Sequence, residues 1–485
     1  MNDLVESHRK LCLDRRGLFQ GAAAAAVLLG RGAAAAPADP SAGPVVTPDP
    51  IKAPIEKSGI AVEIVDFCQP PRSSATKPFA MLNQLYHAGL GTSWLYVNDT
   101  LGKIWRVDRV TGAARLFFNY ASARGTLLQT GQQKGLRGFA FHPDFYRPSE
   151  RGYRRFYTLA TESVGGAQTG VTIFDGPFVT QFHNVLTEWR VTSPNELKVD
   201  LSSRREILRI SNYFRDHCSD LPMFNPHAMP GDADYGMLYI ATGDGGRYNP
   251  NPDPYNQAQD PLSPRGKILR INPLGGNGRR YQIPVDNPFV GNTAYLPEIW
   301  ATGLRHPQYF SWDLGGDKTL IIVDIGQDQI EEINLGIKGA NYGWPLREGT
   351  FVTDRTDQTT LYALPEDDAT RGFTYPVAQY DHSEGAAICG GYVYRGTKIP
   401  ALDGHYIFGD LINGRVFHLP VTSLQQGTQA TIYELTLKRN GVTTTMQELV
   451  KGQFNRVDMR FGQGPGGAMY IMSKQDGLIR KLLPA

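Results

Sequence analysis

The stretch WLYVNDTLGKIWRVD at residues 94–108 holds the pattern that decides the fold. An apolar run at 94–97 is followed by turn residues and then by a second apolar run at 103–107. Two short apolar runs separated by Asn, Asp and Gly are typical of a β-hairpin. Similar pairs of runs recur along the chain, at 156–159 with 187–191, 237–240 with 267–271, 320–323 with 332–335, 405–408 with 415–419, and 469–472 with 478–482.

Six such units over about 420 residues leave roughly 70 residues for each, which is enough for a four-stranded sheet with long loops. Almost no segment after residue 60 has helical periodicity. The sequence therefore predicts an all-β fold over residues 59–485, a six-bladed β-propeller with four-stranded antiparallel blades. The strand at 60–65 is expected to pair with the last blade and close the ring. The alternative is a β-sandwich array or two smaller β domains.

The composition is that of an ordinary folded chain, with 41% hydrophobic and 20% charged residues. The formal charge is +2, from 49 basic and 47 acidic residues, and the excess falls within residues 1–38. A near-neutral domain lacks the basic surface that nucleic acids or anionic membranes require. We therefore expect neither nucleic acid nor membrane as a partner.

Residues 1–38 are predicted to be an export signal. The arginine pair at 15–16 precedes an apolar run at 22–29 that is too short to span a bilayer of about 30 Å. The arginine pair resembles a twin-arginine signal, and Ala-Pro-Ala at 36–38 fits a cleavage site. These features predict a periplasmic or secreted bacterial protein with no membrane span in the mature chain. Residues 39–58 are predicted to be a flexible lead-in.

Two polar loops carry the oxygen ligands that a hard cation such as calcium prefers. The loop at 243–259 is rich in Asn, Asp, Gln and Gly, but the same residues also form Asx turns, so both interpretations stay open. The loop at 324–332 combines carboxylates with Gly326, whose carbonyl could point inward. Calcium could be held there by backbone oxygens and Glu332, or Glu332 could cap a turn.

Several side chains outside these loops are candidates for acid–base chemistry or anion binding. His227 lies in the Pro/Gly-rich segment 225–231, where it is either a general base or a surface histidine. Arg305 and Arg456 could bind an anionic ligand, because a guanidinium matches a carboxylate in geometry. His142 follows a predicted strand and is expected to be buried and structural.

Five segments together resemble the soluble sugar dehydrogenases that depend on pyrroloquinoline quinone (PQQ), the glucose/sorbosone dehydrogenase family. They occur in the family's order across almost all of residues 60–485. They are GQQKGLRGFAFHPDF at 131–145, GDGG with YNQAQDPLSPRGKILRINP at 243–273, EIWATGLRHPQ at 298–308, EEINLGIKGANYGWP at 331–345 and ICGGYVYRGTKIP at 388–400. The resemblance implies a six-bladed propeller, PQQ and calcium as cofactors, a sugar or polyol substrate, and an external electron acceptor such as a cytochrome or a quinone.

The resemblance also assigns roles to individual residues. His227 would be the base that takes the hydroxyl proton, and Arg305 would act beside it. The residues placed against the cofactor are Gln133, Arg305, His306, Gln308 and Arg456.

The family's metal and substrate positions fall on a second set of residues. The carbonyl oxygens of Gly326 and Gln327 would hold a calcium ion that acts as a Lewis acid. Glu332 and Tyr342 would bind further calcium ions. The substrate side is expected at Tyr380 and His382.

The sequence departs from the family pattern at several of these positions. His306 stands where the family has Asn, and Pro226 stands where an acidic residue precedes the base. Asp458 replaces the second arginine of an Arg-x-Arg pair, and the turn at 411–414 has no lysine. The loss of two cations weakens the attraction for a tricarboxylate.

The main hypothesis is a quinoprotein dehydrogenase that oxidises an aldose or a related alcohol or polyol by hydride transfer to PQQ with calcium assistance. One alternative is a propeller of this family that has lost PQQ and works as a ligand-binding or interaction module. Another is a calcium-dependent enzyme without redox chemistry. A dehydrogenase requires net positive charge around positions 412 and 458.

Overall fold

The computed structural model describes residues 39–87, 93–193, 198–246, 253–354 and 359–485, so the predicted export signal at 1–38 lies outside the described residues. Within those ranges the α-helices are two short ones, α3 (Tyr120–Arg124) and α4 (Met446–Val450), and nearly all other regular structure is β. The prediction of an all-β fold is confirmed. None of the helices in the described ranges is long and apolar enough to cross a membrane.

The strands form runs of antiparallel neighbours that largely follow chain order. The first two runs are β2 (Leu82–Tyr86), β3 (Trp94–Asp99), β4 (Lys103–Asp108) and β5 (Ala114–Asn119), and then β6 (Leu136–Phe141), β7 (Arg155–Ser163), β9 (Phe182–Val191) and β10 (Val199–Asn212), with β8 (Thr172–Phe174) beside β10. The next two runs are β11 (Ser219–Phe224), β12 (Leu238–Thr242), β13 (Lys267–Ile271) and β14 (Ile299–Ala301), and then β15 (Tyr309–Trp312), β16 (Leu320–Asp324), β17 (Ile330–Leu335) and β21 (Ala378–Asp381).

Two more runs complete the arrangement within the described residues. They are β22 (Ile388–Val393), β23 (His405–Asp410), β24 (Val416–Pro420) and β25 (Tyr433–Arg439), and then β27 (Met459–Gln463), β28 (Met469–Ser473), β29 (Ile479–Pro484) and β1 (Glu56–Cys68). A small separate sheet holds β18 (Arg347–Glu348), β19 (Phe351–Thr353) and β20 (Leu361–Tyr362), and β26 (Val442–Thr444) pairs with β25. All six strand pairs that the sequence predicts are present as antiparallel neighbours.

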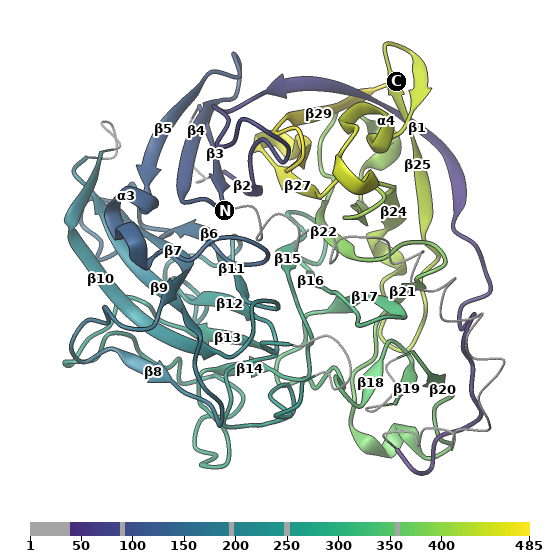
Figure 1. Cartoon of the computed structure of the whole chain (residues 1–485), viewed down its shortest axis with the longest axis horizontal. Coiled ribbons are helices and arrows are strands. Elements are labelled where there is room, and N and C mark those ends of the chain that lie inside the picture. Colours follow the sequence, from purple (N-terminus) through teal and green to yellow (C-terminus); the bar gives the residue numbers. More distant parts are fainter. Residues whose placement is uncertain (1–38, 88–92, 194–197, 247–252, 355–358) are drawn as a thin grey trace, which may run out of the picture.

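The N-terminal strand joins the start of the chain to its end. β1 pairs antiparallel with β29, with Ile64 opposite Leu482, and parallel with β25. The predicted pairing of the strand at 60–65 with the last sheet is therefore confirmed. In Figure 1 the sheets follow one another around the molecule, and the purple β1 runs beside the yellow-green β25. Hydrogen bonds do not link the described sheets into one continuous ring, so the six-bladed ring stays a prediction.

The core lies between neighbouring sheets. The first strands of several runs, β6, β11 and β22, are buried along their whole length. Strands covered on both faces carry apolar residues without strict alternation, which explains the continuous apolar run of β16. One core cluster contains Trp300, Ile322 and Phe417, which come from three consecutive runs. Burial of these side chains holds adjacent sheets face to face.

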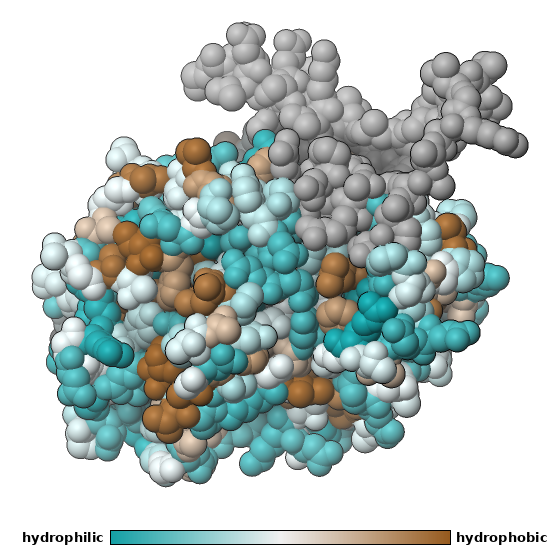
Figure 2. Space-filling model, turned by 90° about the horizontal axis from the view of Figure 1, so that it is seen from below, coloured by the Kyte–Doolittle hydropathy of each residue, from teal (hydrophilic) through white to brown (hydrophobic). Residues whose placement is uncertain are grey.

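The exposed surface is mainly hydrophilic. Large apolar side chains that are exposed, such as Val110, Val285 and Val442, are scattered over different elements. Figure 2 shows brown residues in separate groups among teal ones on the face in view. Scattered apolar residues of this kind are normal for a folded domain.

The segment that precedes β1 is packed against the body of the protein. The buried Asp39 forms ion pairs with Arg347 (3.1 Å) and Arg371 (2.8 Å), and Val45 forms a β-bridge with Tyr362. The structure therefore places residues 39–46 beside the small sheet, and the N–H of Ile51 donates to Asp381 of β21 at 3.1 Å, in the segment where the sequence predicted a flexible lead-in. Its Pro and Ala content disfavours regular structure but does not prevent specific contacts.

Candidate active site

The candidate site is built by the segments that precede β6, β11 and β15. The side-chain carbonyl of Gln133 accepts a hydrogen bond from the backbone N–H of His217 at 2.6 Å. The ring of His217 stacks on that of His306, with centroids 5.1 Å apart and planes at 24°. The structure thus brings together Gln133, Arg305 and His306, as the resemblance implies, and adds His217, which the sequence analysis did not single out.

Each of the two stacked histidines is bonded to a buried aspartate. His217 Nδ1 lies 2.7 Å from Asp244 Oδ1, and His306 Nε2 lies 2.6 Å from Asp220 Oδ2. Asp244 Oδ2 also accepts a bond from the indole N–H of Trp344 at 2.8 Å. Because Asp244 accepts the Nδ1 proton, Nε2 is the nitrogen of His217 that can take a proton.

Burial and nearby cations set the protonation state of His217. Burial lowers its pKa well below the usual value, and the positive charge of Arg305 lowers it further. Burial also raises the pKa of Asp244, which the bonds from Trp344 and Gly246 oppose. A histidine with a low pKa is neutral near pH 7, and a neutral imidazole is the form that acts as a base.

Arg305 connects the stacked histidines to the loop that follows β16. Its backbone N–H donates to Asp324 at 2.7 Å, and the neighbouring N–H of His306 donates to the same carboxylate at 2.6 Å. Its guanidinium donates to the side-chain oxygen of Gln327 at 2.8 and 2.5 Å and to the carbonyl of Ile325 at 2.8 Å. Asp324 therefore fixes the backbone of Arg305, and the loop fixes its side chain.

The loop at 325–330 is organised by the buried carboxylate of Glu348. Oxygen Oε1 accepts the N–H groups of four consecutive residues at 2.8 to 3.3 Å, namely Gln327, Asp328, Gln329 and Ile330. In a trans peptide the carbonyl points opposite to the N–H. The carbonyls of Gly326 and Gln327 therefore point away from Glu348. A side chain at 326 would lie 1.6 Å from the carbonyl of Ile330, so this position requires glycine.

The chemistry of this loop fits a calcium ion, which prefers oxygen ligands that include backbone carbonyls. The other two predicted calcium ligands are engaged within the protein. Glu332 accepts bonds from the N–H of Gly349 (2.6 Å) and from Asn334 (3.0 Å), and burial raises its pKa to about 7. The hydroxyl of Tyr342 donates to the carbonyl of Leu335 at 2.6 Å. Across the described ranges, no cluster of three His, Cys, Asp or Glu side chains is arranged to hold a metal.

In the polar loop at 243–259, Asp253 bonds to the backbone of its own loop. The Asp253 carboxylate accepts the N–H groups of Gln257 at 2.6 Å and Ala258 at 2.8 Å. These bonds give Asp253 a structural role, because its carboxylate holds the backbone of this part of the loop. Residues 247–252 lie outside the described residues.

The structure does not bring His227 into the site. β11 has 6 residues, so its ends are about 20 Å apart at about 3.3 Å per residue. His217 precedes this strand and His227 follows it. The ring of His227 donates from Nε2 to the carbonyl of Asp313 at 2.7 Å, beyond the far end of β15. The missed signal is the dipeptide Asp216-His217, because an acidic residue precedes the base in the family pattern.

Arg456 belongs to a different segment, the one that precedes β27. Its side chain is 41% exposed and forms an ion pair with Asp458 at 2.9 Å. A different cation, Lys474, is buried next to this segment, and its backbone N–H donates to the carbonyl of Asp458 at 3.3 Å. Burial, together with Arg460 and Arg137, lowers the pKa of Lys474 well below its usual value. Among the described residues, no carboxylate forms an ion pair with its ammonium.

Two further polar groups are buried beside these cations. Arg137 donates from Nε to Asp220 at 2.6 Å, which links the cations to the His306–Asp220 pair. The side-chain oxygen of Gln308 is buried and has no hydrogen-bond partner among the described residues. Buried cations and an unsatisfied oxygen are the groups expected where a polar ligand is to bind.

The two residues predicted on the substrate side differ in their surroundings. His382 Nε2 lies 2.8 Å from Glu331 Oε1, and Glu331 in turn accepts the N–H of Gly326 at 3.3 Å. Tyr380 is buried and its hydroxyl lies 3.4 Å from Asp410. His382 is therefore connected to the Gly326 loop, whereas Tyr380 is part of the core.

An aromatic pocket of about 400 Å³ lies beside the site. Phe178, Tyr213 and Tyr255 line it, and the rings of the two tyrosines are 4.9 Å apart. Tyr213 is in close range of Gly245, whose N–H donates to the carbonyl of His217 at 3.3 Å. The pocket therefore adjoins the segment that carries His217.

The fold is similar to those of soluble sugar dehydrogenases of known structure. The apo form of the soluble aldose sugar dehydrogenase from Escherichia coli aligns with a TM-score of 0.58 and 19% identity, over 88% of this chain and 100% of that one. The PQQ-bound aldose sugar dehydrogenase from Streptomyces coelicolor aligns with a TM-score of 0.54 and 19% identity, over 89% and 99%. At this level of identity the similarity concerns the fold.

Sequence relatives include both sugar dehydrogenases and Hedgehog-interacting proteins. The HIPL1 protein of Arabidopsis thaliana is 31% identical over 58% of this chain and 43% of its own length. Quinoprotein glucose dehydrogenase B of Acinetobacter calcoaceticus is 27% identical over 56% and 51%. Human Hedgehog-interacting protein is 23% identical over 81% and 48%. The chain thus spans about half the length of these relatives.

A family model provides the strongest assignment. The model for Glucose / Sorbosone dehydrogenase matches residues 227–481, which is more than half of the 485 residues. This match covers the sheets from β12 to β29 together with the Arg305 and Gly326 segments. The chain therefore belongs to the glucose/sorbosone dehydrogenase family.

Proposed function

We propose that the protein is a quinoprotein dehydrogenase that oxidises an aldose or a related polyol, with PQQ and calcium as cofactors. The observation that carries this proposal is a buried histidine, His217, that is paired with Asp244 and stacked on the ring of His306. Membership of the family and the PQQ-bound structural neighbour support the choice of cofactor.

We also propose that the six antiparallel runs are the blades of a closed propeller. The pairing of β1 with β29 supports closure, because it joins the chain's first strand to its last sheet. The segments before β6, β11 and β15 then lie at one end of a central channel. Ligand sites on rings of this kind gather where such loops converge.

His217 acts as the base in this proposal. Oxidation of a carbinol removes a proton from the hydroxyl and a hydride from the carbon. Nε2 of His217 takes the proton, and Asp244 stabilises the imidazolium that forms. When bound, PQQ supplies the two-electron acceptor and calcium supplies a Lewis acid. Arg305, held by Asp324 and Gln327, orients the polar groups beside the base.

Lys474 replaces the cations that are missing at positions 412 and 458. Its ammonium is buried close to the charges of Arg460 and Arg137, and burying a cation without an ion pair is costly. A carboxylate of the cofactor would compensate this charge. Pairing with that carboxylate would raise the pKa of Lys474, so the positive charge required near position 458 would form when the cofactor binds.

The aromatic pocket provides a surface for the substrate. The faces of sugar rings are apolar, and they pack well on aromatic side chains. Phe178, Tyr213 and Tyr255 offer three rings beside the segment that holds His217. This arrangement favours a cyclic sugar over a small linear alcohol.

The second candidate function is a ligand-binding propeller that has no PQQ. The observation that favours it is the ion pair between Arg456 and Asp458 at the place where the family pattern has two arginines. A carboxylate in this position repels an anionic cofactor. The alignments with HIPL1 and with human Hedgehog-interacting protein cover 58% and 81% of this chain, which also favours the binding function.

A calorimetric titration of the calcium-loaded protein with PQQ separates the two functions. The wild type is expected to bind one equivalent, Lys474→Met is expected to bind at least about tenfold more weakly, and the exposed control Lys57→Met is expected to match the wild type. Saturable binding would be followed by assays of aldoses and polyols with an artificial electron acceptor. Absence of PQQ binding to the wild type would overturn the dehydrogenase in favour of the binding module.

A further inference from the structure

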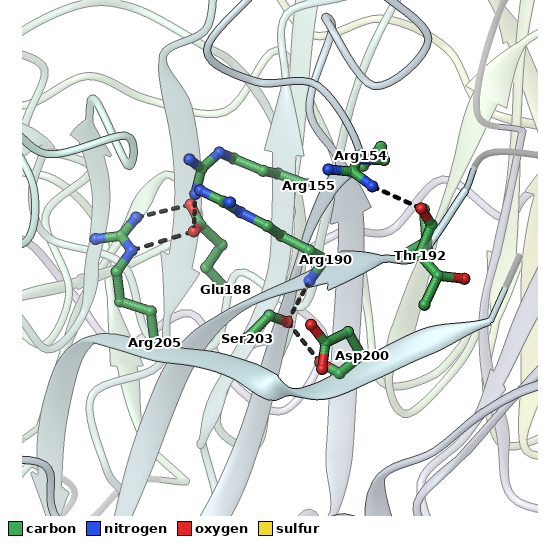
Figure 3. A pocket seen from close by; sticks show the side chains of 9 residues that line it. Arg154, Arg155, Glu188, Arg190, Thr192, Asp200, Ser203 and Arg205 are labelled. Carbon is green, nitrogen blue, oxygen red and sulfur yellow. Dashed lines mark hydrogen bonds and ion pairs between the residues drawn. The ribbon is translucent and has the colours of Figure 1, made fainter. Parts of the chain in front are cut away.

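A second polar pocket lies on the sheet formed by β7, β9 and β10. It has a volume of about 490 Å³, and four arginines line it, Arg154, Arg155, Arg190 and Arg205. Figure 3 shows Arg155, Arg190 and Arg205 gathered around Glu188. No feature of the proposed dehydrogenase uses these residues.

The pocket lies at the other end of its sheet from the candidate active site. β6 follows the Gln133 segment, and its first residue, Leu136, pairs with Ala160 near the end of β7. Phe141, at the end of β6, pairs with Phe156 at the start of β7. Arg154 and Arg155 are next to Phe156, so the arginine pocket is remote from His217.

Strand register explains why the arginines meet. Arg190 of β9 is opposite Arg155 of β7 and Asp200 of β10, and Glu188 is opposite Arg205. Directly paired residues, and residues two apart on one strand, point to the same face of a sheet. Like charges placed opposite each other are unfavourable, so this grouping needs a compensating negative charge.

The protein supplies only part of that charge. Glu188 is bonded to Arg155, and it accepts two bonds from Arg205 at 2.7 and 3.1 Å. The Asp200 carboxylate accepts the N–H and hydroxyl of Ser202 at 2.9 and 2.6 Å rather than a bond from an arginine. The pocket therefore contains four guanidinium groups and two carboxylates, and the Asp200 carboxylate is bonded to Ser202.

Two of the arginines keep unused donor groups. The side chain of Arg190 is exposed and forms no hydrogen bond or ion pair with any residue in the described ranges. Arg154 donates from Nη1 to the carbonyl of Thr192 at 2.6 Å, but its buried Nε has no partner among the described residues. Partial burial on the sheet, together with the positive charge of Arg155, lowers the pKa of Arg190.

We propose that this pocket binds a doubly charged tetrahedral oxyanion, a phosphate or sulfate group, through Arg190 and Arg154. One guanidinium group can donate two parallel, charge-assisted hydrogen bonds to two oxygens of such an anion. The anion would neutralise the excess charge and satisfy the buried Nε of Arg154. The pocket is larger than one such anion and has the size of small-molecule sites in general. The group is therefore carried on a larger ligand, such as a sugar phosphate.

Calorimetric titration of the full-length protein with inorganic phosphate and with glucose 6-phosphate tests the proposal. The wild type is expected to bind both ligands saturably at one site, with tighter binding of the sugar phosphate. Arg190→Gln is expected to weaken both by at least about tenfold, because it removes a charged donor pair. The matched control is Arg115→Gln, which removes the same charge from an exposed position on β5.

Comparing Arg190→Gln with Arg115→Gln shows whether phosphate binds in this pocket or at another cationic part of the surface. Arg190 forms no ion pair with a carboxylate in the described ranges, so both variants are expected to keep the wild-type melting temperature. Tighter binding of glucose 6-phosphate would support a sugar-borne group, and equal binding would support the free anion at the same site. Absence of phosphate binding would overturn the proposal, as would binding that Arg190→Gln and Arg115→Gln change equally. Arg190→Gln distinguishes this pocket from the proposed sugar site, because only binding in the arginine pocket depends on Arg190.

Discussion

His217 and His227 flank β11, one at each end, and the proposed mechanism uses only the first. Replacing His217 by Gln removes the base and is expected to lower kcat by a factor of about 10² to 10⁴, the usual contribution of general base catalysis. His227→Gln is the matched control and is expected to retain activity within about twofold, because its ring donates to the carbonyl of Asp313, beyond the far end of β15. Steady-state assays with an artificial electron acceptor measure both.

Measuring PQQ binding shows whether His217→Gln loses activity because the base is missing or because the cofactor no longer binds. We expect His217→Gln to bind PQQ as the wild type does, since His217 is assigned to proton transfer. If His227→Gln lost activity while His217→Gln kept it, the assignment of the base would be reversed.

His418 makes stability depend on pH in the acid range. Its pKa is lowered to about 4 by burial and by the neighbouring His405, with Nδ1 atoms 2.8 Å apart. The unfolded chain takes up this proton near pH 6.5, and the folded protein takes it up only near pH 4. The unfolded state therefore binds more protons between these values, and the free energy of unfolding falls as the pH falls, by up to about 3 kcal/mol.

Urea unfolding at several pH values between 7 and 4 measures this contribution. His418→Gln removes the titrating group and is expected to lose less stability than the wild type over the same range. Curves of stability against pH that run parallel for the two proteins would show that His418 does not contribute.

At the level of strands, much of the fold could be predicted from the sequence. The pairs at 94–97 with 103–107 and 469–472 with 478–482 are close in sequence, and a turn joins each pair. Turn residues and apolar runs are local signals, so they are visible in the sequence. The packing of Asp39 on Arg347 is not visible there, because it joins segments about 300 residues apart.

The active site could be predicted only in part for the same physical reason. Arg305 and His306 lie in a recognisable segment, but the partner of His306 is Asp220 on a different sheet. Which histidine joins this group depends on which end of β11 faces the site. That choice is set by strand direction in the folded protein and not by the residues around each histidine.

The strand β1 is expected to stabilise the protein by burying apolar residues against the last sheet. Val62 on β1 is fully buried, with 0% exposure, whereas Val442 on β26 is 68% exposed. Val62→Ala is expected to lower the free energy of unfolding by about 2 kcal/mol. The same change at Val442 is expected to cost less than about 0.5 kcal/mol. Chemical denaturation measures both, and equal costs would contradict the role of β1.

The loop at 325–330 depends on Glu348 for its conformation. Glu348→Ala leaves four backbone N–H groups without their acceptor, and each buried unsatisfied group costs about 1–3 kcal/mol. Glu348→Gln is the matched control, because its side-chain carbonyl can still accept. We expect calcium affinity, measured by calorimetry, to fall strongly in the Ala variant and little in the Gln variant. Equal affinity in all three proteins would place calcium away from this loop.

At the scale of the whole molecule, the tryptophans can test whether the sheets form one closed unit. The chain has 6 tryptophans, and all of them lie between residues 94 and 344, outside the runs that begin at β22 and β27. Tryptophan fluorescence therefore reports on the earlier runs, whereas far-UV circular dichroism reports on every sheet. If β1 closes the ring, both signals are expected to change at the same urea concentration, because no run can unfold without exposing its neighbours. Two separate midpoints would instead favour two smaller β domains.

The variant Val62→Asp puts a charge into the closing strand and is expected to lower both midpoints together. A shift of the circular dichroism signal alone would show that closure does not couple the two halves.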